Sequence, residues 1–191
     1  MTSTELAGGR DVVAFLVAQH QQIKDLFERV TAARGEERRE AFTSLRRLLA
    51  VHETAEEEVV HPRAREALDD GDEIVDARLQ EENEAKQTLA TLEKLDVDSS
   101  EFEKLFQELQ ADVLLHAASE EEKEFGRLAD ELDGDQLARM QKAVELAEAT
   151  APTRPHPGVE SAKANLLAGP FAAMLDRARD LLTGKSDHDA R

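Results

Sequence analysis

The stretch that decides the fold is VHETAEEEVVHP, Val51 to Pro62, which gathers two histidines and four glutamates in front of a proline. Most such runs of charge lie on a solvated helix face. His52, however, lies three residues after Leu49, and Glu56 lies four residues after His52, so both share the face that carries the apolar residues. Helical phase therefore predicts that these two side chains point into a core while most of the other charges face solvent.

The same pattern recurs on two further predicted helices. His116 lies three residues after Val113 and is followed by Glu120 four residues later. His20 lies four residues after Leu16, on the apolar stripe of its own helix. A lone inward histidine is more often a hydrogen-bonded core residue than a ligand. Two HxxxE pairs in phase with a third inward histidine favour a metal site.

The third predicted helix supplies a carboxylate to the same core. Glu82 lies three residues after Leu79 and seven before Leu89, near the centre of the apolar face. Asn83 is rotated from it by about 100°, so Glu82 is the inward residue of the two. A buried carboxylate costs several kcal/mol unless it is paired or coordinated. With three histidines and three carboxylates in one core, a multivalent cation is the simplest compensation.

Phase assigns less central places to the other polar residues of the opening stretch. His61 lies nine residues after His52, half a turn away from the inward face, so we expect it at the surface or rim. The alternative is that Pro62 alters the local geometry and leaves His61 in contact with a metal ligand. Glu53 is about 100° from His52 and reaches a metal only by crossing the helix surface. Glu57 and Glu58 are expected in solvent.

Hydrophobic periodicity predicts an all-α chain whose four long helices form an up-down-up-down bundle with extra C-terminal helices. The expected helices cover about residues 11–33, 37–60 and 75–92, and a fourth begins at Ser100. Pro62 stops or kinks the second helix. Ser100 to Glu103 has the form of a capping box and opens the fourth.

The predicted domain organisation has four parts. Residues 1–130 form the bundle, and residues 131–150 form a further helix, packed on its outside or end. Residues 151–183 form a proline-containing strap and a docking helix, whose apolar stripe covers either its own bundle or a second copy in a homodimer. Residues 184–191 are expected to be disordered.

Composition narrows the functional classes. The 191 residues carry 42 acids against 24 bases, a formal charge of −18, which argues against nucleic-acid and membrane partners and favours cations. The absence of cysteine excludes thiolate and iron–sulfur sites and leaves histidine and carboxylate as metal ligands. That favours iron, with manganese or zinc as alternatives. The first residues lack an export signal, so we expect a cytoplasmic protein.

Four segments of the chain resemble the hemerythrin-like HHE cation-binding family: DVVAFLVAQH, LLAVHETAEEEVVHP, EENEAKQTLATLEKL and LLHAASEEEKEF. The resemblance covers residues 11–128 and implies metal ligation by His20, by the pair His52 and Glu56, and by the pair His116 and Glu120. In some relatives the residue after the first motif histidine also binds metal, which gives Glu53 a role.

The chain departs from this family at two points. Family members usually carry Glu-His in the third helix, whereas this chain reads Glu81-Glu82-Asn83, so one expected imidazole is missing and Glu82 takes its place. The chain also has no tyrosine, and His61 stands where many relatives have tyrosine before proline. That departure argues against tyrosine-dependent chemistry.

The main functional hypothesis is a non-haem di-iron protein that reacts with oxygen, peroxide or nitric oxide, with catalase-like or oxidase activity. Extra negative charge at the site stabilises ferric over ferrous iron and so favours reaction over reversible oxygen carriage. One alternative is an iron or redox sensor in which metal controls docking of the C-terminal helix. Another is a helical interaction module, with or without zinc, that performs no redox chemistry.

Overall fold

The computed structural model describes residues 11–151, and all regular structure in that range is helical. The helices in chain order are α1 (Val12–Ala32), α2 (Gly35–Ala55), η1 (Glu56–Val60), α3 (His61–Ala67), α4 (Gly71–Leu92), α5 (Ser100–Glu120), η2 (Glu121–Phe125), α6 (Gly126–Glu131) and α7 (Gly134–Glu148). Here η1 and η2 are single π-helical turns that join α2 to α3 and α5 to α6 without a break. The predicted strap, docking helix and tail lie outside the described residues.

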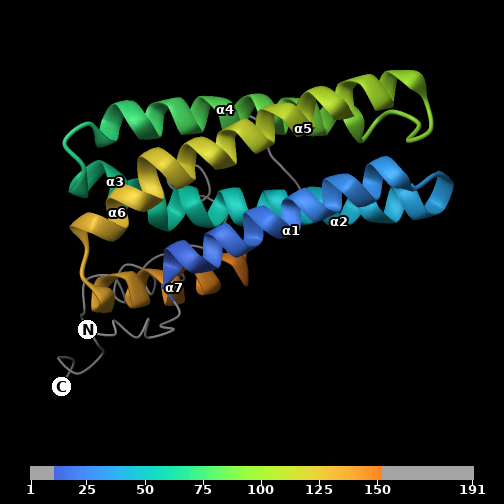
Figure 1. Ribbon diagram of the computed structural model, residues 1–191. Helices are drawn as coiled ribbons and strands as arrows, with labels where there is room; N and C mark the ends of the chain where they lie inside the picture. The colour runs from blue at the N-terminus through green and yellow to red at the C-terminus, as the bar shows by residue number, and fades with distance from the viewer. Residues whose placement is uncertain (1–10, 152–191) are drawn as a thin grey trace, which may run out of the picture.

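Four long helical paths run antiparallel to one another (Figure 1). The α1–α2 and α4–α5 connections lie at one end of the bundle, and α3, α6 and α7 lie at the other. The predicted all-α, up-down-up-down bundle is confirmed. Within residues 11–151, no helix has both the length and the apolar character that crossing a membrane requires.

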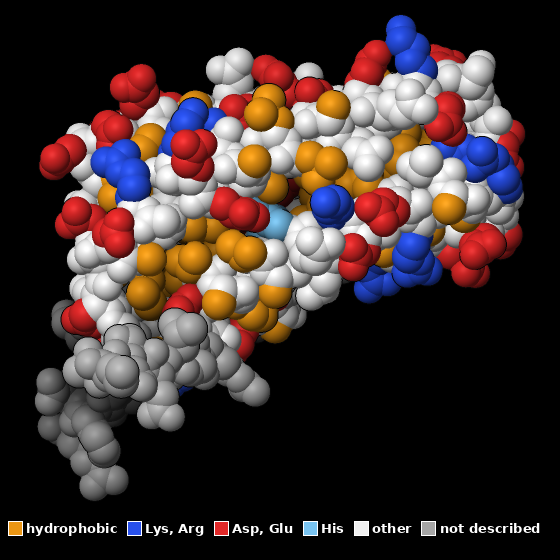
Figure 2. Space-filling view, in the orientation of Figure 1, with side chains coloured by type: hydrophobic (Ala, Val, Ile, Leu, Met, Phe, Trp, Pro, Cys, Tyr) orange, Lys and Arg blue, Asp and Glu red, His pale blue; other side chains and the backbone are white. Residues whose placement is uncertain are grey.

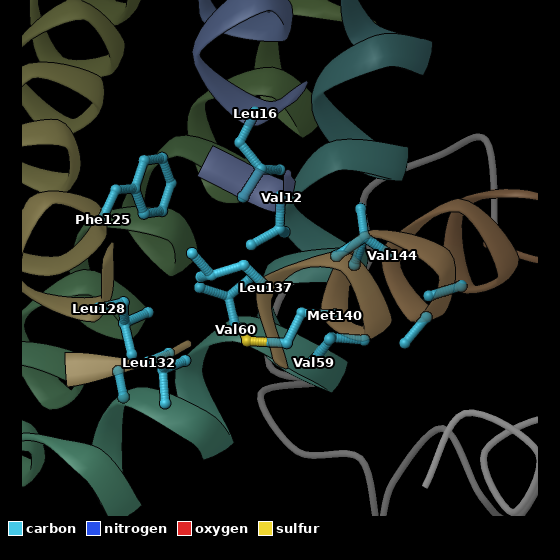
Figure 3. Packing of buried hydrophobic residues seen from close by; sticks show 14 of the residues in the cluster. Val12, Leu16, Val59, Val60, Phe125, Leu128, Leu132, Leu137, Met140 and Val144 are labelled. Carbon is cyan, nitrogen blue, oxygen red and sulfur yellow. The ribbon is translucent and has the colours of Figure 1, made fainter. Parts of the chain in front are cut away.

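The bundle core consists of two apolar clusters. The phenylalanine cluster lies towards the α1–α2 and α4–α5 connections and is built around Phe27, Phe42, Phe102 and Phe106. The α7 cluster lies at the other end and joins α7 to residues such as Val12, Leu16, Val59, Val60 and Phe125 (Figure 3). Between the two clusters lies a layer of buried histidines and glutamates.

Helix α7 closes the end of the bundle that carries the π turns. The side chains of its apolar stripe, Leu137, Met140 and Val144, are buried against the ends of α1 and α2 and against η1. Asp133 caps the helix and forms a full capping box with Gln136. Helix α7 therefore covers the π turn η1 and shields that side of the polar layer with apolar side chains.

Two local predictions need correction. The residue that caps α5 is Ser99, one before the predicted Ser100, because its side chain accepts the backbone N–H of Phe102. Of the two alternatives at Pro62, a stop or a kink, the stop is wrong, because the second helical path continues to Ala67. Proline is tolerated there because it lies in the first turn of α3, directly after a π turn.

Candidate metal centre

The polar layer occupies the gap between the two apolar clusters on every helix of the bundle. On α1, His20 lies between Leu16 of the α7 cluster and Ile23 of the phenylalanine cluster. On α4, Glu82 lies between Val75 and Ala85 in the same way. The layer is thus a belt across the middle of the core, shielded at both ends by apolar side chains.

Six of the seven predicted ligands come together in two groups whose ligand atoms all lie within 4.8 Å of one another. The first group is His20, His52, Glu56 and Glu120, and the second is Glu56, Glu82, His116 and Glu120. Glu56 and Glu120 belong to both groups. A carboxylate that belongs to two ligand sets has two oxygens and can reach a cation in either set.

The seventh predicted residue, Glu53, is buried beside the groups but belongs to neither. The ammonium of Lys86 lies 3.9 Å from Glu53 Oε2 and is bonded to Glu57. Burial raises the pKa of Glu53 to about 8, against the opposing effect of Lys86. In this structure Glu53 is therefore placed as a neighbour of the lysine, and its role as a ligand stays a prediction.

Each of the three predicted histidine ligands has its Nδ1 fixed by an oxygen from outside the two groups. His20 Nδ1 lies 2.8 Å from Glu121 Oε1, His52 Nδ1 lies 2.7 Å from Gln19 Oε1, and His116 Nδ1 lies 2.8 Å from Glu81 Oε2. An oxygen at Nδ1 accepts the N–H and leaves the lone pair of a neutral ring on Nε2. All three Nε2 atoms thus face the groups as donors for a cation.

The atoms that face the centre lack partners within the described protein. Neither oxygen of Glu56 or Glu120 has a hydrogen-bond partner, and the same holds for Glu82 Oε2 and His116 Nε2. The Nε2 atoms of His20 and His52 lie 3.1 Å apart, so two lone pairs would repel unless a cation or proton lies between them. Ligand atoms about 2.0–2.2 Å from one metal ion are themselves about 3 Å apart, which fits this spacing.

The separations within each HxxxE pair fit shared coordination equally well. His52 Nε2 lies 3.3 Å from Glu56 Oε1, and His116 Nε2 lies 3.1 Å from Glu120 Oε1. Residues four apart on a helix lie one above the other, which explains why both pairs converge. The donor set, imidazole nitrogen and carboxylate oxygen without sulfur, suits iron, manganese or zinc.

The electrostatics of the layer show the cost of leaving it without cations. Burial and the nearby Glu120 carboxylate raise the pKa of Glu56 well above its usual range. Burial, together with repulsion from His20, lowers the pKa of His52 to about 3. Burial alone would also raise the pKa of Glu120, but His116 and His20 lower it well below its usual range. Burial alone would lower the pKa values of His20 and His116, but the nearby Glu120 carboxylate raises both.

The charge count leads to the same conclusion. Six glutamate side chains of the described core are at most 8% exposed: Glu53, Glu56, Glu57, Glu82, Glu120 and Glu124. The buried ammonium that contacts this set is Lys86, which lies against Glu53, Glu57 and Glu82. With all six glutamates ionised and the histidines neutral, five negative charges are left to compensate, and two divalent ions would supply four positive ones.

The predicted positions of His61 and Glu57 are wrong. His61 is 2% exposed rather than at the rim, and Glu57 is buried on Lys86 rather than solvated. Glu58 is half-buried, and burial raises its pKa to about 7. For His61 the reason is the π turn η1, which inserts about one residue relative to an α-helix and rotates the later residues of the path by about 100°. Glu57 lies four residues after the buried Glu53 and shares its contact with Lys86.

A second π turn produces the other residues that phase reasoning missed. Turn η2 brings Glu121 onto His20 and buries Glu124 against His61. One feature of the sequence marks both turns, because HxxxEEE occurs at residues 52–58 and again at residues 116–122. Each π turn begins at the first or second glutamate of that run. π turns inside α-helices are rare and are found frequently at functional sites.

A cavity of about 150 Å³ connects the groups with the surface. It is lined by the buried His52 and Glu82 and by the exposed Glu84, Asp112 and Leu115. The space-filling view shows a histidine side chain at the bottom of a hollow bordered by acidic and apolar side chains (Figure 2). The volume is below the roughly 300–1,000 Å³ of pockets for drug-sized molecules, so the cavity suits small ligands.

Comparison with known proteins identifies the class of this bundle and its site. The model of the hemerythrin HHE cation-binding domain matches residues 11–128. The chain therefore belongs to the hemerythrin HHE cation-binding family, whose members are metal-binding helical proteins.

Two individual proteins are similar to the chain. An uncharacterized hemerythrin-like protein of Schizosaccharomyces pombe is 27% identical over 136 residues, which cover 70% of this chain and 67% of that protein. The crystal structure of a hemerythrin HHE cation-binding domain-containing protein from Mycobacterium kansasii has a TM-score of 0.62 at 19% identity. The similarity covers 88% of this chain and 98% of the M. kansasii chain. At 19% identity it shows the fold alone.

Proposed function

We propose that the protein holds two iron ions in a non-haem di-iron centre and reacts with oxygen, peroxide or nitric oxide. The observation that carries the proposal is the pair of ligand groups that share Glu56 and Glu120. One group would hold an ion through two imidazoles, and the other through the single imidazole of His116 and the carboxylate of Glu82. A site for one ion would need neither two groups nor two shared carboxylates.

The donor set supports iron in a reactive rather than an oxygen-carrying role. Three carboxylates accompany three imidazoles, and extra negative charge favours the higher oxidation state of a bound metal. When bound, a di-iron centre supplies redox electrons and open positions for small ligands. The protein's own residues orient the imidazoles through Gln19, Glu81 and Glu121 and exclude bulk water with two apolar clusters.

The cavity supports a small substrate. Its inner wall is formed by residues of the proposed centre, and its rim is exposed at α4 and α5. A molecule of two to four atoms can pass, whereas an organic substrate of ordinary size would need the helices to move apart. Oxygen, hydrogen peroxide and nitric oxide satisfy this limit. Catalase-like turnover of peroxide and oxidase activity are the reactions to assay first.

Metal analysis combined with an absorption spectrum tests the proposal. The purified protein should contain close to two iron ions per chain, and the oxidised form should absorb in the near ultraviolet and visible as an oxo-bridged ferric pair does. A second portion reconstituted with zinc should show the same stoichiometry and no such bands. Two zinc ions in the protein as purified would instead favour a metal-stabilised helical module without redox chemistry.

A further inference from the structure

His61 is a fully buried imidazole that belongs to neither ligand group. It lies between two carboxylates, with Nε2 2.7 Å from Glu82 Oε1 and Nδ1 2.9 Å from Glu124 Oε1. His61 is 2% exposed, and neither carboxylate is more than 1% exposed. The three side chains therefore form a buried hydrogen-bonded chain, the relay Glu124–His61–Glu82, and its last member, Glu82, is a predicted metal ligand.

Both π turns are needed to build this relay. His61 directly follows η1, and Glu124 lies within η2. In a continuous α-helix His61 would face half a turn away from His52, and the two π turns bring residues of different helices into contact. The same segment of α5 and η2 also delivers Glu120 and Glu121, so His61 is locked to the part of the chain that forms the centre.

The contact with His61 determines which oxygen of Glu82 is free. Oε1 is occupied by His61, whereas Oε2 has no hydrogen-bond partner and lies 3.5 Å from the ammonium of Lys86. Glu82 thus has one oxygen fixed by His61 and one oxygen without a hydrogen-bond partner, which is the arrangement of a carboxylate prepared to bind a cation.

We infer that His61, anchored by Glu124, is the positioning residue that holds Glu82 in its metal-binding orientation. The inference rests on the proposed di-metal centre, of which Glu82 is a ligand, and adds to it a residue that does not itself bind metal. It also explains how the second group works without the imidazole that α4 lacks. His61 acts through Glu82 on the group of Glu56, Glu82, His116 and Glu120 and not on the group that contains His20.

A matched pair of substitutions tests this role by titration of the metal-free full-length protein with Co²⁺. The amide nitrogen of His61→Gln reaches the place of Nε2 and keeps the donor to Glu82, whereas the shorter His61→Asn reaches only the place of Nδ1 and Glu124. His61→Asn should weaken the second Co²⁺ by about 10–100-fold and leave the first unchanged. His61→Gln should retain both affinities. Equal weakening in both variants would reduce His61 to a packing role and overturn the inference.

The NMR spectrum of the Co²⁺-loaded wild-type protein gives an independent readout that needs no variant. Each imidazole that binds Co²⁺ through Nε2 keeps its Nδ1–H, which then resonates far outside the normal range. Three such exchangeable signals are expected, from His20, His52 and His116. Four signals would make His61 a ligand and overturn its positioning role. A protein that binds no Co²⁺ would refute the metal centre itself, an outcome distinct from four signals or from equal weakening.

Discussion

The phenylalanine cluster and the polar layer are neighbours in one bundle, yet they are stabilised in opposite ways. In the cluster, Phe106 packs with its ring centroid 5.3 Å from that of Phe27 and 5.5 Å from that of Phe102. In the layer, Glu56 and Glu120 are 0% exposed, and none of their oxygens has a hydrogen-bond partner in the described protein. The cluster is complete by itself, whereas the layer requires something that the chain does not supply.

The comparison shows that stability and the candidate metal site depend on different regions of the core. Apolar burial contributes about 25 cal/mol per Å² of surface removed from water, so the two clusters hold the four paths together. Burial of uncompensated carboxylates opposes folding. The apolar clusters therefore supply the stability that keeps the buried ligands together. Substitutions in the clusters should change the free energy of unfolding, and substitutions in the polar layer should change metal binding.

The largest effect is expected from removal of a shared carboxylate. Glu120→Ala should abolish binding of both ions, because Glu120 belongs to both ligand groups. Glu82→Ala should lower the content only to about one ion, because Glu82 belongs to one group. Metal analysis after reconstitution measures both, with Glu101→Ala, on the exposed start of α5, as the control. Equal losses in the two variants would remove the distinction between shared and unshared ligands.

A cavity in the phenylalanine cluster should change stability and leave metal binding intact. Phe106→Ala removes a ring that contacts Phe27, Phe42 and Phe102 and should cost about 3–5 kcal/mol of the free energy of unfolding. Urea denaturation of the metal-loaded protein measures the cost, and Phe106→Leu should lose less. If the folded variant also lost its metal, the clusters and the layer would not be separable.

The metal-free protein should lose stability as the pH rises. Burial raises the pKa values of Glu53 and Glu57 to about 8 from an ordinary 4.5, so the folded state keeps protons that the unfolded chain has released. His52 opposes this trend slightly, because its folded pKa is about 3 while the unfolded ring, with its ordinary pKa of 6.5, still releases protons in this range. The free energy of unfolding should therefore fall by about 3 kcal/mol between pH 6.5 and 8.

Urea denaturation at these two pH values, after removal of metal, checks the sign. Glu57→Gln should flatten the dependence because it removes one of the groups that hold a proton. A metal-free protein that became more stable between pH 6.5 and 8 would show that these carboxylates are ionised in the folded state.

The smallest effect is expected at the cap of α5, far from the polar layer. Ser99→Ala removes the acceptor for the backbone N–H of Phe102 and should cost about 1 kcal/mol, whereas Ser99→Asp should retain the cap. Thermal denaturation measures the loss, and metal content should stay unchanged. A fall in metal content would show that fraying at the start of α5 also displaces His116 near the end of that helix.

The two regions also differ in how well the sequence predicts them. In the phenylalanine cluster, phase placed Leu49, Leu89 and Val113 in the core, and all are buried. Phase placed His52 and Glu56 correctly too, because His52 precedes the first π turn and Glu56 begins it. It failed for His61, since a π turn rotates the later residues of its helix and no hydrophobic period reveals the inserted residue. It failed for Glu57 because the contact with Lys86 of α4 depends on how the two helices pack.

Other parts of the site lay beyond sequence reasoning for a different reason. The Nδ1 partners Gln19, Glu81 and Glu121 belong to different helices from the histidines they orient. Such contacts depend on how far each helix is rotated and shifted against its neighbour, which a single sequence does not specify. The departure at Glu82 was readable because it lies within one regular helix, and its side chain is 1% exposed as expected.

The most direct test of the di-iron centre is an anomalous-scattering map from crystals of the iron-loaded protein, collected at the iron absorption edge. Two iron peaks are predicted in the polar layer. Each should contact both Glu56 and Glu120, with His20 and His52 at one ion and with His116 and Glu82 at the other. A single peak, or iron bound by Glu53 and Glu57 in place of the shared carboxylates, would contradict this account.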